Sequence, residues 1–257
     1  MKLTILGSGT YQPDNKRHTA GYLVQTNKQN IVFDFGRGTL DQLLALNIHY
    51  YDIAAIFISH MHPDHASELI SFLHIALAEP GREIGGKRRV KDITIYGPKK
   101  IKKQIAGMLK IFSLSGRAPK KKVILKELAN GDRVRGRGWK LHSFRAEHGI
   151  EALSFRLEST GKIFAYSGDT KDCPGLRQAC KDADVAVIET SWPEKMKPKT
   201  HMSGDATAKL AQESGIKKLV ATHIAPYYLS NFDVRADLKK HFTGKIIVAK
   251  DLLSIKI

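Results

Sequence analysis

Cysteine is scarce in this chain, with only Cys173 and Cys180 among 257 residues. The two fall seven positions apart on a stretch that we expect to be one helix, which would separate them by about 10 Å along the helix axis. That separation is too long for a comfortable disulfide. We therefore expect two reduced thiols without a metal or redox role, as in a cytoplasmic protein.

Long hydrophobic runs are also missing. No stretch of about 18 apolar residues occurs, so we expect no membrane-spanning helix. The apolar run at 3–6 is too short for a signal peptide, and none is expected. Because the chain has no internal repeat, low-complexity linker or break in composition, we predict a single domain over residues 1–257.

Acidic residues are few relative to basic ones. The chain has 42 Lys and Arg against 25 Asp and Glu, a formal net charge of +17. Residues 87–140 hold 18 of the basic residues and only three acidic ones, and so contribute +15. This excess favours a polyanionic partner such as nucleic acid, although an anionic membrane surface or a generally basic proteome would also fit. A solvated charged face is an equally good interpretation of the segment.

Histidine, by contrast, is concentrated at residues 60–65, where His60, His62, Asp64 and His65 fall within six positions. They follow the apolar, β-branched run 53–58, which predicts a buried strand that ends just before a helix. Imidazole nitrogen is a preferred ligand of zinc-like metals, and aspartate adds a hard oxygen donor. This density of ligand atoms favours a metal site over a solvated polar turn.

The remaining patterns predict strands and helices in alternation. The expected strands are 3–6, 22–26, 31–34, 53–58, 93–96, 141–144, 152–157, 163–166, 185–188, 219–222 and 246–248, and the expected helices are 40–46, 69–77, 101–109 and 206–211. Several of the later strands are followed closely by a side chain of metal-binding type. These side chains are His148, Asp169, Glu189, His201 and His223. Their recurrence near strand ends predicts that they meet at one edge of a sheet.

The run from His60 to His65, followed in order by His148, Asp169 and His223, resembles the signature of the metallo-β-lactamase-fold hydrolases. The resemblance implies an α+β fold, a four-layer αββα sandwich, with two divalent metal ions at one edge. Zinc would be the expected metal, and manganese or iron would accept the same ligands. By motif position, His60, His62 and His148 would hold one ion, Asp64, His65 and His223 the other, and Asp169 would bridge both.

Within that superfamily the chain is similar to the ribonuclease Z branch. The resemblance rests on subsidiary motifs at 7–10, 13–17, 33–36, 189–190, 201–203 and 222–226. Enzymes of that branch usually carry a long arm that grips tRNA between the positions of His148 and Asp169. Only 20 residues separate these two here. The hairpin expected over 152–166 leaves no room for an arm. Related phosphodiesterases that lack the arm and act on small cyclic or phosphoribosyl esters are therefore an alternative to tRNA processing.

We therefore predict a ribonuclease Z-like phosphodiesterase that uses a hydroxide activated by two metal ions. Asp64 is the expected proton acceptor and His201 the expected acid for the leaving group. Asp34 and Glu189 are expected to orient ligand histidines. RNA, bound through residues 87–140, is the leading substrate, and a homodimer is left open. The alternatives are a small-molecule phosphodiesterase, a metal-containing nucleic-acid-binding protein without catalysis, and a thioester or lactone hydrolase.

Overall fold

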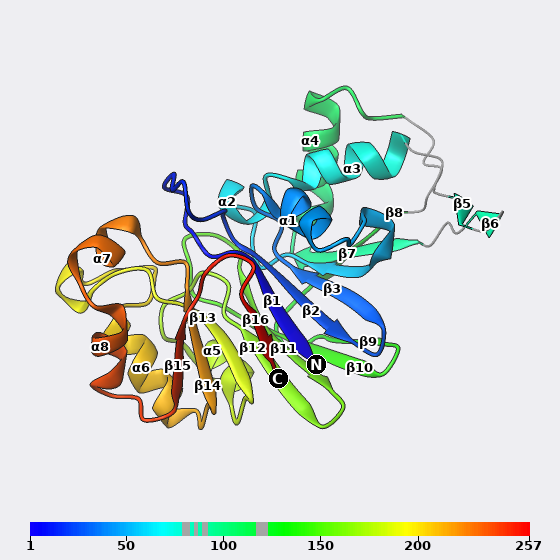
Figure 1. Ribbon diagram of the computed structural model, residues 1–257. Helices are drawn as coiled ribbons and strands as arrows, with labels where there is room; N and C mark the ends of the chain where they lie inside the picture. The colour runs from blue at the N-terminus through cyan, green and yellow to red at the C-terminus, as the bar shows by residue number, and fades with distance from the viewer. Residues whose placement is uncertain (79–82, 85–86, 89–91, 117–122) are drawn as a thin grey trace.

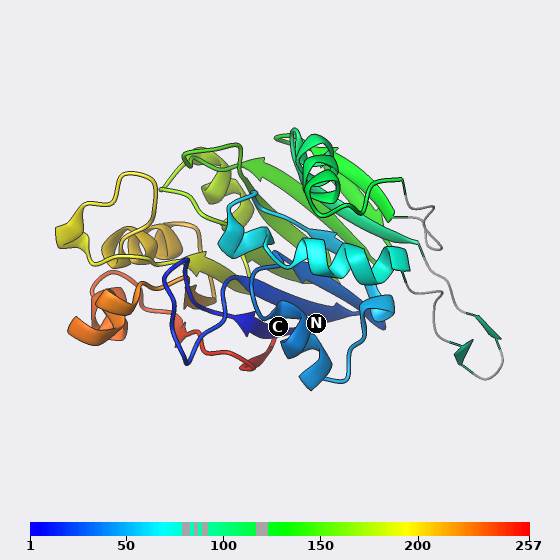
Figure 2. The same ribbon diagram turned by 90° about the horizontal axis from the view of Figure 1, so that it is seen from above.

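Two seven-stranded sheets lie face to face, and helices cover their outer faces (Figures 1 and 2). The computed structural model describes residues 1–78, 83–84, 87–88, 92–116 and 123–257. The layers run helix, sheet, sheet, helix, which confirms the predicted α+β, four-layer αββα fold class.

The first sheet has the strand order β16-β1-β2-β3-β4-β7-β8. In that order the strands are Ser254–Lys256, Lys2–Gly7, Gly21–Thr26, Gln29–Phe33, Ile53–Phe57, Ile93–Pro98 and Val123–Leu128. The helices that follow its strands are α1 (Thr39–Ala45), α2 (Pro63–Ala66), α3 (Leu69–Ala78) and α4 (Ile101–Ile111), together with the 3₁₀ turn Tyr50–Asp52. Strands β3, β4, β7 and β8 run parallel, and the others pair antiparallel.

The second sheet has the order β15-β14-β13-β12-β11-β10-β9. Its strands are Lys245–Val248, Lys218–Thr222, Val185–Glu189, Lys162–Tyr166, Leu153–Ser159, Trp139–Arg145 and Arg133–Gly136. Its helices are α5 (Pro174–Cys180), α6 (Gly204–Glu213), α7 (Pro226–Asn231) and α8 (Val234–Lys239), with the 3₁₀ turn Glu194–Met196. A separate short pair joins β5 (Glu83–Ile84) to β6 (Lys87–Arg88).

The alternation of side chains along each strand explains the four layers. In β4, Ala55 and Phe57 lie in the core between the two sheets, while Ile56 packs into the core under the helices of the first sheet. Successive strand residues point to opposite faces, so a strand covered on both sides must be apolar throughout. All five residues of β13 are buried for this reason.

The parallel strands bring their carboxyl ends to one edge, and the predicted site residues follow those ends. Residues 60–65 come after β4, Asp169 after β12, and His223 directly after β14. Strands β11 and β12 pair as an antiparallel hairpin that takes up most of the chain between His148 and Asp169. The structure therefore bears out the expectation that no arm fits there.

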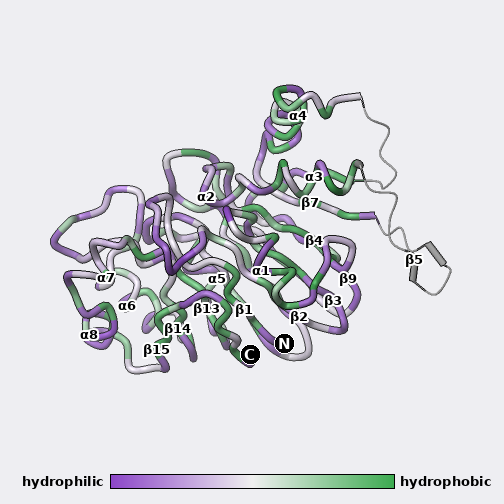
Figure 3. Tube along the Cα trace, turned by 45° about the horizontal axis from the view of Figure 1, so that its top comes forward, coloured by the Kyte–Doolittle hydropathy of each residue, from purple (hydrophilic) through white to green (hydrophobic). Residues whose placement is uncertain are grey.

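The basic segment 87–140 does not form one unit. Its described residues lie in β6, β7, α4, β8, β9 and the start of β10, and so contribute to both sheets; residues 89–91 and 117–122 lie outside the described part. The exposed residues of its described part are spread over α4, the end of β8, β9 and the loops between them, and hydrophobic and hydrophilic residues alternate along α4 (Figure 3).

Two expectations about the rest of the chain can be compared directly with the structure. Cys173 and Cys180 are both free and lie at the beginning and the end of α5, as predicted, and the structure shows both to be buried. Among the described residues, no helix is both long and apolar enough to cross a membrane.

Candidate metal centre

The turn after β4, residues 58–65, holds its polar side chains on a backbone with little conformational freedom. Pro63 occupies the first position of α2, where its missing N–H and fixed φ suit a helix start. The short helix turns Asp64 and His65 inward, and His60 is also buried. Four potential ligands therefore stand at the junction of the two sheets on a rigid turn.

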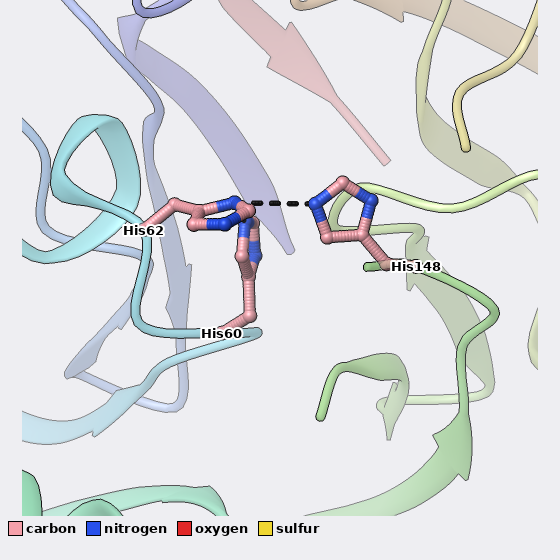
Figure 4. A group of neighbouring side chains, drawn as sticks. All are labelled: His60, His62 and His148. Carbon is pink, nitrogen blue, oxygen red and sulfur yellow. Dashed lines mark hydrogen bonds between the residues drawn. The ribbon is translucent and has the colours of Figure 1, made fainter. Parts of the chain in front are cut away.

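A first donor group consists of His60, His62 and His148. His62 Nδ1 lies 3.0 Å from His60 Nε2 and 3.2 Å from His148 Nε2. Figure 4 shows the three imidazoles pointing toward one another from two separate loops, the one after β4 and the one between β10 and β11. Each ring offers one nitrogen to the same point.

A second donor group consists of Asp64, His65, Asp169 and His223, all of them buried. His223 Nε2 lies 3.1 Å from Asp64 Oδ2 and 3.3 Å from His65 Nε2. Asp169 is 3.2 Å from His65 through Oδ1 and 3.9 Å from His60 through Oδ2. The Asp169 carboxylate thus lies between the two donor groups, where a bridging ligand would be needed.

The residues fit divalent metal ions by two observations. Ligands of one tetrahedral ion at about 2.1 Å stand about 3.4 Å from each other, which is close to the separations within both groups. In addition, Asp169 Oδ1 is buried yet accepts no hydrogen bond from any residue that the structure describes. Because a buried, unsatisfied carboxylate oxygen is costly, a cation at this point would satisfy it.

Hydrogen bonds outside the donor groups fix which nitrogen of each imidazole faces inward. His65 Nδ1 donates to Asp34 Oδ2 at 2.6 Å, and His148 Nδ1 donates to the carbonyl oxygen of Thr200 at 3.1 Å. The hydroxyl of Ser59 donates its proton to Asp34 and can therefore only accept from His60. His60 Nδ1 accordingly donates to Ser59 Oγ at 3.0 Å. The Nε2 lone pairs of these rings are left for a metal.

The fourth such imidazole is His223, whose Nδ1 lies 3.1 Å from Ser191 Oγ. That hydroxyl donates to Glu189 Oε2 at 2.5 Å and so serves as acceptor for the ring. Glu189 therefore orients a histidine of the second donor group through Ser191, whereas Asp34 contacts its histidine directly. Both were expected to orient ligand histidines.

Without a cation, the protonation of the donor groups suits a metal only in part: burial would lower the pKa of His65, but the carboxylates of Asp169 and Asp34 raise it well above its ordinary value, so a metal must displace a proton from this ring. Burial, together with the neighbouring imidazoles, lowers the pKa of His60 well below its ordinary value, so this ring is neutral. Burial would raise the pKa of Asp64 and Asp169, but the imidazoles of the second donor group outweigh it and lower both pKa values. Neutral imidazole and ionised carboxylate are the forms that bind metal.

His201 stands at the side of the second donor group and is partly exposed. Its Nδ1 lies 3.0 Å from Glu189 Oε2 and 3.8 Å from Asp169 Oδ2. Burial would lower the pKa of His201, but the hydrogen bond to Glu189 and the negative charges of both carboxylates raise it to about 9. Nε2 of His201 has no partner among the described residues.

The structure thus brings together every residue that the sequence predicted for the site. These residues are His60, His62, Asp64, His65, His148, Asp169, His201 and His223. Sequence reasoning found Asp34 and Glu189 but missed the other groups that orient the site, namely Ser59, Ser191, Thr200 and the hydroxyl of Tyr166, which donates to Asp34. Serine, threonine and tyrosine are too common for their roles to be read from one sequence.

Comparison with known proteins agrees with this geometry. Residues 29–224 match the family model described as "Beta-lactamase superfamily domain". A protein named ribonuclease Z from Methanosarcina acetivorans is 26% identical over 315 aligned positions, covering 100% of this chain and 98% of the relative. Another, from Ligilactobacillus salivarius, is 28% identical and covers 96% of this chain and 94% of the relative.

Among solved structures, the short form of human tRNase Z is similar with a TM-score of 0.78 at 21% identity, covering 100% of this chain and 99% of the other. The match to the superfamily model covers most of the chain. It confirms the resemblance seen in the motifs. The chain belongs to the beta-lactamase superfamily, as a ribonuclease Z-like member with the metallo-β-lactamase fold.

Proposed function

We propose that this protein is a metal-dependent hydrolase of phosphodiester bonds that works with two divalent ions, preferably zinc. The carrying observation is the Asp169 carboxylate, which lies between the two donor groups and has a buried oxygen with no hydrogen bond from the described residues. Manganese or iron would accept the same imidazole and carboxylate ligands. When bound, two such ions supply Lewis-acid polarisation of the phosphoryl group and activation of water.

The chain's own residues complete the reaction. Asp64 belongs to the second donor group through Oδ2, and we assign it the proton of the attacking water. His201 holds one proton on Nδ1 against Glu189 and can release a second from Nε2, which has no partner in the described structure, to the leaving oxygen. The raised pKa of His201 keeps this second proton in place at neutral pH.

RNA is the proposed substrate. The support comes from full-length relatives named ribonuclease Z and from the net charge of +15 in residues 87–140. The alignment to the Methanosarcina acetivorans relative is longer than this chain, so the relative has segments without a counterpart here. With no arm in the β11–β12 hairpin, we propose that the basic segment supplies the contacts to phosphate. Affinity for RNA should then fall steeply from low to moderate salt.

A small-molecule phosphodiesterase is the second candidate, favoured by the same missing arm. Rapid turnover of bis(p-nitrophenyl) phosphate with no cleavage of any RNA would support it. Two further functions remain as outcomes of the same assay. Binding of RNA without hydrolysis would indicate a metal-containing binding protein, and turnover of thioesters or lactones alone would indicate one of those hydrolases.

The deciding experiment combines metal analysis of the purified protein with a panel of RNA, small phosphodiester, thioester and lactone substrates. We expect about two ions per chain and hydrolysis of phosphodiesters. His65→Ala should lose both metal and activity. His74→Ala is the matched control, because His74 is exposed on α3. Phosphodiester hydrolysis that persists in His65→Ala would refute the proposed site.

We further propose that residues 1–257 form one domain that acts in the cytoplasm. The two buried, free cysteines support a reducing compartment. Light scattering coupled to size-exclusion chromatography will decide between a monomer and the homodimer that the sequence left open.

A further inference from the structure

A cavity of about 780 Å³ lies beside His148. It is bounded by the loop between β10 and β11, by the start of α5 and by residues 199–200, and His148 itself is part of its wall. Thr200, which accepts the Nδ1–H of His148, also lines it. The cavity therefore opens directly next to the first donor group, and no role has yet been assigned to it.

The polar wall of this cavity contains cations without partners. Arg145 and Lys199 are exposed, and neither forms an ion pair with any residue in the described part of the chain. A third cation, Lys171, is paired with Glu147 at 2.9 Å. The Arg145 and Lys199 side chains are thus available to an anionic ligand.

A smaller hollow of about 300 Å³ adjoins the same loop through Ile150 and Glu151. Lys99 and Lys100, at the beginning of α4, line it together with Met61, the residue between His60 and His62. Neither ammonium group has an ion-pair partner among the described residues. The two lysines belong to the basic segment, which thus reaches the edge that carries the donor groups.

The two hollows meet at the loop that carries His148. Ile150 and Glu151 line both of them, and each hollow also includes a neighbour of the first donor group. An elongated ligand can therefore run through both hollows past the loop that carries His148, beside the first donor group. Each end would then lie next to a pair of cations.

We propose that the two hollows form one track for a single-stranded polynucleotide. This inference rests on the proposed phosphodiesterase function. The scissile phosphate lies at the donor groups, phosphates on one side lie near Lys99 and Lys100, and phosphates on the other side lie near Arg145 and Lys199. The protein would thus contact the nucleotides on both sides of the cleaved bond.

Glu151 adds one carboxylate to the wall that the hollows share, but the four cations outnumber it, so the arrangement of charge favours a polynucleotide over a small diester. A small diester carries one phosphate, which the donor groups already hold, so it gains nothing from cations in either hollow. A polynucleotide repeats its phosphates and can contact both pairs, releasing counterions at each. Removing two contacts should lower the salt dependence of single-strand binding by about 1.4 in the slope of log affinity against log salt.

The test uses three double variants that each remove two positive charges and keep the side-chain stem. Two alter the track: Lys99→Gln with Lys100→Gln, and Arg145→Gln with Lys199→Gln. The third, Lys2→Gln with Lys256→Gln, is the control, because these exposed lysines face each other on β1 and β16 at the chain ends. Each is assayed on a single-stranded RNA hexamer and on bis(p-nitrophenyl) phosphate.

We expect the ratio of kcat/KM on the hexamer to kcat/KM on the small diester to fall at least tenfold in each track variant. The same ratio should stay within twofold of wild type in the control. An equal fall in the control would show that only overall charge matters and would overturn the track, as would unchanged ratios in the track variants. Failure of the wild-type protein to hydrolyse either substrate would instead refute the proposed function itself.

Discussion

His65 Nδ1 donates to Asp34 Oδ2 at 2.6 Å, and this bond sets the imidazole tautomer of the second donor group. The same carboxylate accepts the backbone N–H and the hydroxyl of Ser59. Asp34 has a φ of 55°, a left-handed conformation that Asn also tolerates. Asp34→Asn is therefore a substitution that changes hydrogen bonding with little change in backbone strain.

We expect Asp34→Asn to weaken metal binding about 10- to 100-fold. An amide at this position offers N–H groups to neighbours that are donors themselves, and so favours the tautomer with the proton on Nε2 of His65. Competition with a chelator measures the affinity. Asp41→Asn, an exposed change on α1, should bind metal as wild type does, and equal affinity in Asp34→Asn would contradict the assigned role.

His201→Gln should lower kcat on substrates with poor leaving groups by about 10² to 10⁴. The loss should be much smaller for p-nitrophenolate, which leaves without a proton. Because the pKa of His201 is raised to about 9, its extra proton is present at neutral pH and is lost as the pH rises through 9. The basic limb of the rate profile should therefore vanish in His201→Gln. An equal loss on good and poor leaving groups would argue against an acid.

Gly168→Ala tests how closely the two sheets approach at the site. Gly168 has a φ of 60°, and a Cβ there would lie 2.7 Å from Ser59 Cβ and 3.0 Å from the carbonyl oxygen of Leu153. The substitution would push Asp169 away from the turn that carries His60. We expect a destabilisation of about 1–3 kcal/mol together with weaker metal binding. Gly107→Ala on α4, where a Cβ meets nothing, is the control for chemical denaturation.

Cys180 should resist thiol reagents in the folded protein. Burial raises the pKa of its thiol to about 12, so almost no thiolate forms at pH 8. Labelling of Cys180 with a disulfide reagent should require unfolding, and the rate of labelling should follow the rate of unfolding. Fast labelling of Cys180 in native buffer would show that α5 opens far more readily than its buried packing suggests.

Much of the fold was predictable because long apolar strands and metal-ligand spacing are local signals. The run 53–58 and the His-rich turn after it predicted both a strand and half of the site. The ordering of the remaining ligands came from the family resemblance. What failed was the detection of short elements and of β8: β16 has three residues, and α7 and α8 have six each, so a hydrophobic pattern repeats too few times in them to stand out. Strand β8 has six residues but lies in the basic segment, where charged side chains dominate the pattern.

The finer details of the site depend on contacts between residues far apart in the chain. Tyr166 reaches Asp34 across 132 positions, and Ser8 accepts the backbone N–H of His223 through its carbonyl oxygen. No local pattern marks either residue. The cavity beside His148 was equally hidden, because residues 145, 171 and 199 lie on three separate segments.

The two donor groups draw ligands from both halves of the chain. His60, His62, Asp64 and His65 extend from the first sheet, and His148, Asp169 and His223 extend from the second. Ions held between them would act as a staple across the sandwich, so their binding free energy would also be folding free energy. Chelation should then lower the melting temperature, and replacing the metal in a series of increasing affinity should raise it step by step.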